Sequence, residues 1–163
     1  MKSLDFRGKT ILFLGSSVTY GAASGGISFV EFTAKECGFD YIKEAVSGTT
    51  LADIDDSSYV SRLKKLNKNL KIDLAVCQLS TNDSYKGIPL KRTREAIIFI
   101  IEYLNKTFVC PVAFFTGTRL KAPDMLKRSL CFQTLKKIMI SGCLICGTIR
   151  KCKVSVMRIT HGL

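Results

Sequence analysis

Short apolar runs separated by polar turns set the pattern of the first 124 residues. Four of these runs are predicted strands, at residues 9–14, 41–46, 71–79 and 110–116, and the first has the pattern of a strand buried on both faces. Between them, apolar residues recur at helical spacing within residues 27–36, 51–70 and 89–105. Strand, loop and helix in series predict an α/β fold of three layers, with helices on both faces of a parallel sheet of four to five strands.

The spacing of the apolar residues also predicts which helix faces are buried. In the first helix the expected buried residues are Ile27, Val30 and Ala34, and Gly38 is the expected stop. In the last helix they are Ile97, Ile98, Ile101 and Leu104. Between these helices, residues 51–70 are expected to form a loop followed by a helix with Tyr59, Leu63 and Leu66 on one side.

Polar residues follow three of the predicted strands at the point where each strand ends. They are Ser16 and Ser17, then Ser47 and Gly48, then Asn82 and Asp83. Ligands bind beyond the carboxyl ends of the strands in a parallel sheet. These loops are therefore expected to converge on one edge, which is the candidate site.

The residue types in these loops suit acyl transfer. A hydroxyl at a strand-to-helix turn, here Ser17, can attack a carbonyl while N–H groups hold the developing oxyanion. Gly48 leaves a backbone N–H open to close approach, and Asn82 offers a side-chain amide donor. The same residue types are also ordinary turn formers and helix caps, so spacing alone leaves both interpretations open.

Three segments resemble the sequence blocks of the SGNH (GDSL-type) hydrolases. Residues 13–21 (FLGSSVTYG) are similar to the first block, 45–51 (AVSGTTL) to the second, and 79–83 (LSTND) to the third. The order of the blocks and their positions after strands also match. The resemblance covers about residues 8–120 and implies a flavodoxin-like fold and a serine ester hydrolase.

The resemblance also implies residue roles. Ser17 would be the nucleophile and one oxyanion donor, and the Gly48 N–H and the Asn82 amide would be the other two donors. Asp83 would orient its loop rather than react.

The chain departs from the family pattern at several positions. Ser16 replaces the Asp of the first block and Ser80 replaces the Gly of the third, and neither change removes a catalytic group. The family completes its triad with Asp-x-x-His, whereas the single histidine here, His161, has Arg158 three residues before it. A guanidinium cannot accept the imidazole N–H and opposes its protonation. The triad base is therefore expected to be missing, and activity to be impaired or absent.

Composition changes abruptly near residue 124. Residues 1–124 hold 17 Lys and Arg and all 13 acids, a net charge of +4, and residues 125–163 hold 8 Lys and Arg and no acid, a net charge of +8. Four of the seven cysteines also lie in the second segment. We expect a hydrolase-like core over 1–124 and an aberrant tail of the same domain over 125–163. Within the tail, residues 125–140 could form a rough helix, and 143–149 could supply the fifth strand.

Three interpretations of the tail are open. A zinc site would use Cys131, Cys143, Cys146, Cys152 and His161, but there is only one close cysteine pair and no second. A disulfide is disfavoured because nothing suggests export. A nucleic-acid-binding arm is disfavoured because the segment is apolar and has little aromatic interleaving.

The third interpretation is a frameshift near Asp124. Codons for residues 144–152, read from their third bases, permit Asp-Leu-Trp-Asn, a segment that SGNH relatives carry at about this distance from the fourth strand. A frameshift would explain the missing acids, the surplus cysteines and the lost triad base together. The gene sequence around codon 124 tests it, since a single-base change there must restore Asp-Leu-Trp-Asn and a downstream Asp-x-x-His.

These observations predict a serine ester hydrolase that acts on small acyl or acetyl esters, including those on carbohydrate. The alternative is a non-catalytic acyl- or carbohydrate-binding domain on the same fold. We expect no cofactor, metal, nucleic acid or membrane partner. The start of the chain lacks a signal-peptide layout, and no apolar stretch reaches the 18 or so residues of a membrane span, so a cytoplasmic protein is expected.

Overall fold

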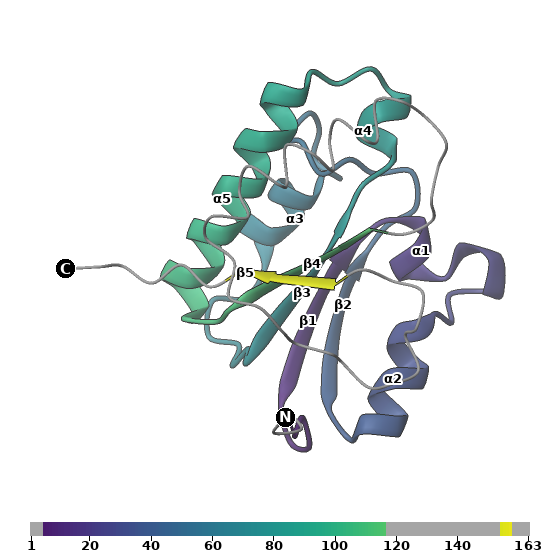
Figure 1. The fold of residues 1–163 in the computed structure, drawn as a ribbon, viewed down its shortest axis with the longest axis vertical. Helices are drawn as coiled ribbons and strands as arrows, with labels where there is room; N and C mark the ends of the chain where they lie inside the picture. Colours follow the sequence, from purple (N-terminus) through teal and green to yellow (C-terminus); the bar gives the residue numbers. More distant parts are fainter. Residues whose placement is uncertain (1–4, 117–153, 158–163) are drawn as a thin grey trace.

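The computed structural model describes residues 5–116 and the backbone of residues 154–157, which form one α/β sheet structure (Figure 1). The strands are β1 (Thr10–Gly15), β2 (Asp40–Ala45), β3 (Leu74–Leu79), β4 (Val112–Thr116) and β5 (Val154–Met157). The helices are α1 (Ser17–Tyr20), α2 (Phe29–Cys37), α3 (Tyr59–Lys65), α4 (Asn82–Tyr85) and α5 (Leu90–Phe108), with a short 3-10 helix at Ala22–Ser24.

The sheet has the strand order β2-β1-β3-β4-β5. The pairs β1–β2, β1–β3 and β3–β4 are parallel, and β5 pairs with β4 in the antiparallel direction. Gly15 at the end of β1 lies opposite Ala45 at the end of β2, and Leu14 lies opposite Cys77 of β3. The first three strands therefore end at the same edge, and the loops that follow them meet there.

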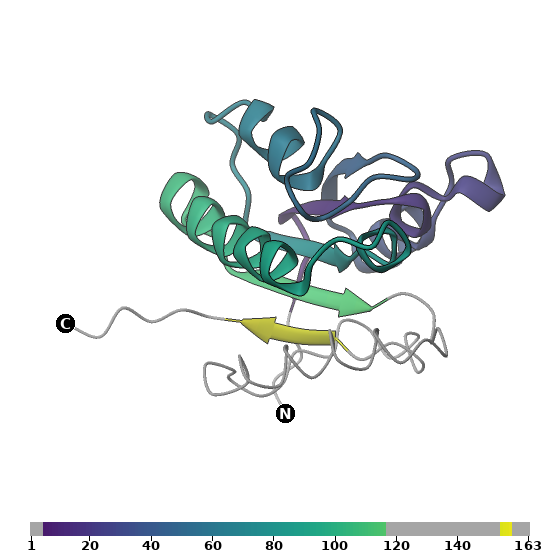
Figure 2. The same cartoon turned by 90° about the horizontal axis from the view of Figure 1, so that it is seen from above.

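Helices cover both faces of the sheet, so the predicted three-layer α/β/α fold is confirmed (Figures 1 and 2). Alternate residues of β1 enter two separate cores. Leu12 and Leu14 pack with buried residues of α3 and α5, and Ile11 and Phe13 pack with residues of α2. This alternation explains why β1 reads as an unbroken apolar run.

Two predicted helix faces need correction. Ile27 precedes α2 and is 53% exposed, because Ser28 caps the helix and the buried face begins at Val30. In α5, Ile98 is 37% exposed and Ile100 is fully buried instead. The predicted stop at Gly38 is correct, since this residue takes the left-handed conformation at the end of α2.

The fifth strand also differs from the prediction. The position beside β4 is taken by Val154–Met157, which runs antiparallel, and not by residues 143–149. An antiparallel edge strand can be formed by a short segment with alternating β-branched residues, such as Val-Ser-Val-Met. Residues 143–149 and the predicted helix at 125–140 lie outside the described residues.

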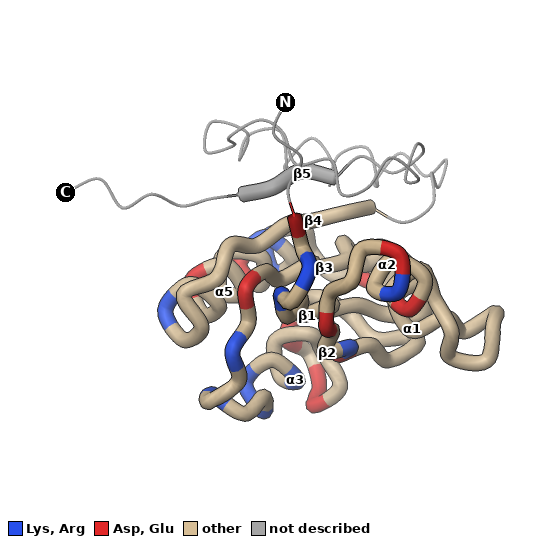
Figure 3. Tube along the Cα trace, turned by 90° about the horizontal axis from the view of Figure 1, so that it is seen from below, with Lys and Arg blue, Asp and Glu red and all other residues tan. Residues whose placement is uncertain are grey.

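None of the helices in the described part of the chain is long and apolar enough to cross a membrane. Basic and acidic residues are interspersed along the described trace, in keeping with the nearly balanced charge of the first 124 residues (Figure 3).

Candidate active site

Ser17 is the first residue of α1, two residues after the end of β1. Gln78, on the neighbouring strand β3, holds the turn that contains Ser17. The side-chain oxygen of Gln78 accepts hydrogen bonds from the Ser16 N–H at 3.1 Å, the Thr19 N–H at 3.3 Å and the Thr19 hydroxyl at 2.7 Å. Ser17 is half-buried, and no hydrogen bond among the described residues involves its hydroxyl. The turn is thus fixed while the hydroxyl remains available for attack.

Gly48 lies in the loop after β2 and is exposed. Its φ of 77° lies in the left-handed region, where glycine carries no steric penalty. The next residue, Thr49, closes the turn by donating its hydroxyl to the Val46 carbonyl at 2.7 Å. Within the described residues the Gly48 N–H has no acceptor, so it is free to face a ligand.

Asn82 is the first residue of α4, three residues after the end of β3. Its side-chain NH₂ donates one hydrogen bond to the Thr49 carbonyl at 2.8 Å. The Ser80 hydroxyl donates to the same carbonyl at 3.2 Å and accepts the Asn82 N–H at 3.1 Å. The structure therefore brings the Asn82 and Gly48 loops together through Thr49, and leaves the second N–H of the amide for another acceptor.

Asp83 is buried and accepts hydrogen bonds from backbone groups of a different loop. Its carboxylate takes the Leu51 N–H at 2.8 Å and the Ala52 N–H at 2.9 Å, with the Thr93 hydroxyl at 3.4 Å. Asp83 therefore fastens the segment that follows Gly48. The sequence predicted an orienting role for Asp83, but in its own loop.

Two buried polar residues at the site, Gln78 and Arg62, were not predicted from the sequence. Gln78 is the one amide in the otherwise apolar strand β3, and Arg62 lies on the same helical stripe as Tyr59 and Leu63. An amide inside an apolar strand is the signal that could have marked Gln78, and a cation on the apolar stripe of a helix is the one that could have marked Arg62. Burial lowers the pKa of the Arg62 guanidinium.

Several predicted site residues lie outside the described residues. They are Arg158, His161 and the tail cysteines Cys131, Cys143, Cys146 and Cys152. Among residues 5–116, no group of three His, Cys, Asp or Glu side chains could hold a metal ion.

No protein-family model matches this sequence, and no curated protein shows significant similarity to it. Solved structures do match. A GDSL-like lipase from Bacteroides uniformis superposes with a TM-score of 0.60 and 18% identity, covering 77% of this chain and 79% of that one. The SGNH-hydrolase family esterase AlinE4 gives a TM-score of 0.57 and 24% identity over 74% of this chain and 63% of its own. The esterase EstA from Pseudoalteromonas gives a TM-score of 0.62 and 17% identity, covering 79% of this chain and 72% of that one.

The chain has the SGNH-hydrolase fold. The chain spans 58% and 59% of the length of two further solved structures, the second a protein from Lactobacillus plantarum. At these identities the likeness establishes the SGNH-hydrolase fold alone, and activity is a separate question.

Proposed function

We propose that this chain is a serine ester hydrolase of the SGNH type that forms an acyl-enzyme on Ser17. Three loops meet at one edge of the sheet beside Ser17, whose hydroxyl makes no hydrogen bond among the described residues, and this observation carries the proposal. The structural neighbours AlinE4 and EstA, both named as esterases, support it by fold.

In the proposed reaction the Ser17 oxygen attacks the ester carbonyl and forms a new C–O bond. The negative charge on the carbonyl oxygen is held by the Ser17 N–H, the Gly48 N–H and the second N–H of the Asn82 amide. The ester C–O bond then breaks, and the alcohol leaves with the proton that Ser17 has lost. Water releases the acid from the acyl-enzyme and restores the hydroxyl.

Turnover is proposed to be slow in this chain because the triad base is missing. The sequence holds one histidine, His161, and Arg158 stands where the family has its Asp. Without a base to take the proton, a serine hydroxyl is a weak nucleophile.

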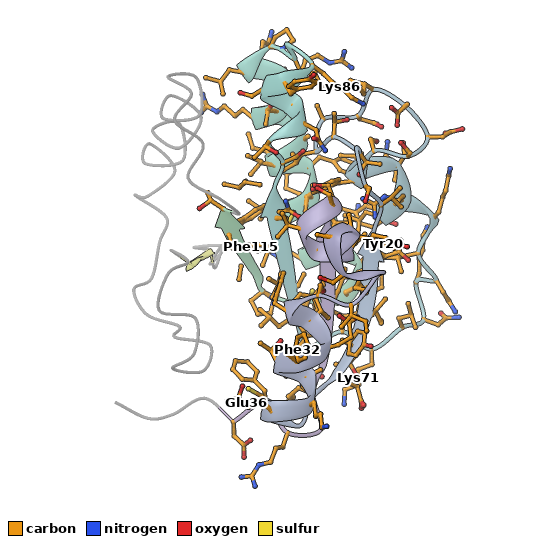
Figure 4. The ribbon with its side chains drawn as sticks, turned by 90° about the vertical axis from the view of Figure 1, so that its right-hand side faces the viewer. Tyr20, Phe32, Glu36, Lys71, Lys86 and Phe115 are labelled. Atoms are coloured by element: carbon orange, nitrogen blue, oxygen red, sulfur yellow. The ribbon has the colours of Figure 1, made fainter. Side chains whose placement is uncertain are left out.

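The substrate is proposed to carry a small uncharged acyl or acetyl group, on an alcohol or a carbohydrate. Val18, next to the nucleophile, and Val46, next to the Gly48 loop, are each 43% exposed. Tyr20 on the same turn is 42% exposed and lies at the face shown in Figure 4. An apolar surround of this kind favours an uncharged acyl group over a charged one.

Added imidazole tests this proposal because it can replace the missing base. We expect imidazole to raise Ser17-dependent hydrolysis of p-nitrophenyl acetate about tenfold or more, which is below the roughly hundredfold or greater contribution of a positioned general base, because free imidazole is not held in place. The Ser17→Ala variant is expected to show only the reaction of imidazole in buffer. Ser24→Ala, at an exposed serine in the 3-10 helix, is the matched control and is expected to respond like the wild-type chain.

The proposal fails if imidazole accelerates the wild-type chain no more than it accelerates Ser17→Ala. Retained binding of an ester analogue in that case would favour the non-catalytic binding domain.

A further inference from the structure

Arg62 is a buried cation beneath the candidate site. It belongs to α3 and is 9% exposed. A buried guanidinium costs free energy unless its donors are satisfied. The closest carboxylate oxygen, Glu44 Oε2, is 3.9 Å from Nη1 and its side chain is one-third exposed. A strong ion pair therefore does not explain how the buried charge of Arg62 is stabilised.

Backbone and hydroxyl oxygens bind Nη2 and Nε instead, while Nη1 is buried with no hydrogen-bond partner among the described residues. Its Nη2 donates to the Gly15 carbonyl at 2.9 Å and lies 3.4 Å from the Thr49 hydroxyl oxygen. Its Nε donates to the Ser57 carbonyl at 2.9 Å, just before α3 begins. The ring of Tyr59 lies under it, with 5.2 Å from the guanidinium carbon to the ring centre. The planar guanidinium is thus held by β1, by the Gly48 loop, by the segment before α3 and by the Tyr59 ring.

These contacts join the two backbone segments that carry the proposed oxyanion donors. Gly15 directly precedes the Ser16–Ser17 turn, and Thr49 directly follows Gly48. The Thr49 carbonyl also accepts the Asn82 amide, so the third donor belongs to the same network. A single side chain therefore links all three donor loops, directly or through one residue.

We propose that Arg62 is a positioning residue that sets the spacing between the nucleophile turn and the Gly48 loop. This inference rests on the proposed function for its kinetic consequence, but the structural tie itself does not depend on activity. A lysine cannot replace Arg62, because its single ammonium nitrogen cannot reach the Gly15 and Thr49 oxygens bound by Nη2 and also the Ser57 carbonyl bound by Nε.

The kinetic test measures the rate at which a fluorophosphonate probe labels Ser17. We expect Arg62→Met and Arg62→Lys to lower the maximal labelling rate about tenfold or more, because small misplacements of reacting groups have large kinetic effects. The concentration of probe at half-maximal rate should stay unchanged. Arg92→Met is the matched control, since Arg92 is an exposed arginine that donates to the Asp53 carbonyl at 2.8 Å. It should label within about twofold of the wild-type rate.

The structural test measures amide hydrogen exchange in a peptide that covers residues 46–52. We expect faster exchange in Arg62→Met, with α5 unchanged, because the loop loses its tie to β1. If the wild-type chain takes up no probe, the proposed function fails, and exchange alone decides the inference.

A second variant covers the case in which Arg62→Met does not fold. Thr49→Val removes the hydroxyl that lies 3.4 Å from Arg62 Nη2 and that also donates to the Val46 carbonyl. We expect labelling to be slower by about fivefold or more, since the loss of one ordinary hydrogen bond corresponds to about fivefold. The inference is overturned if a folded Arg62→Met labels and exchanges like the wild-type chain. It is also overturned if Arg62→Lys labels at the wild-type rate, because charge alone would then suffice. Where Arg62→Met does not fold, a Thr49→Val variant indistinguishable from the wild-type chain in labelling and exchange overturns it.

Discussion

Two glycines of the candidate site are needed for different physical reasons. A Cβ on Gly15 would overlap the Thr19 side chain and lie 2.9 Å from Gln78 Oε1, so no side chain fits there. A Cβ on Gly48 would meet nothing within 4 Å, and only its φ of 77° opposes a side chain. A side chain is excluded at Gly15 by lack of space, and it is disfavoured at Gly48 by the backbone conformation.

This difference predicts unequal costs for the same substitution. We expect Gly15→Ala to lower the free energy of unfolding by about 3 kcal/mol, as overpacking of a rigid site does. Gly48→Ala should lower it by about 1 kcal/mol, the cost of a left-handed conformation. Urea unfolding of both variants measures the two costs, and equal losses would contradict the packing described at Gly15.

At the scale of elements, α2 is tied to β2 through a carboxylate. Glu31 caps the helix by accepting the Ser28 N–H at 2.7 Å, and its other oxygen contacts the ammonium of Lys43 on β2. Lys43 also donates to the Gly26 carbonyl at 2.7 Å, in the loop that follows α1. Burial opposes ionisation of Glu31, but the Lys43 and Ser28 hydrogen bonds outweigh it and lower its pKa from 4.5 to about 2.

A lowered pKa in the folded state makes this tie sensitive to acid. Its contribution to stability is present above the unfolded pKa and is lost as the pH falls from about 5 toward 2. Glu31→Gln should therefore be about 1 kcal/mol less stable at pH 7, once solvent screening is discounted, and this difference should shrink toward pH 2. Thermal unfolding across this pH range measures it, with Glu102→Gln on the exposed side of α5 as control. A difference that is the same at every pH would contradict the assignment.

The elements themselves could largely be predicted from the sequence. Three of the parallel strands, β1, β3 and β4, follow from apolar runs that are buried on both faces, and α5 follows from its spacing. The fourth, β2, is half-exposed and was predicted as a short strand only. The incorrect predictions concern residues whose burial or strand pairing depends on tertiary packing. Ile98 and Ile100 are equally apolar, and only the direction in which α5 packs on the sheet buries the second. The edge strand β5 was missed because apolar content favoured 143–149, whereas Val154–Met157 pairs with β4.

At the scale of the whole molecule, the meeting of three loops at one edge was predictable because parallel strands end together. The ties between the loops were not. Gln78 reaches Ser16 across 62 positions of the chain, and Arg62 reaches Gly15 across 47. Such contacts leave no periodic trace in the sequence. A polar residue at an apolar position could mark Gln78 and Arg62 as unusual, but the groups that they bind appear only in the structure.

The central claim is that Ser17 is the nucleophile of an assembled oxyanion site. Intact-mass analysis with peptide mapping after exposure to a fluorophosphonate probe tests it most directly. We expect the wild-type chain to gain one probe adduct, located on Ser17, and Ser17→Ala to gain none. A folded wild-type chain that gains no adduct, or gains it equally in Ser17→Ala, would contradict the claim.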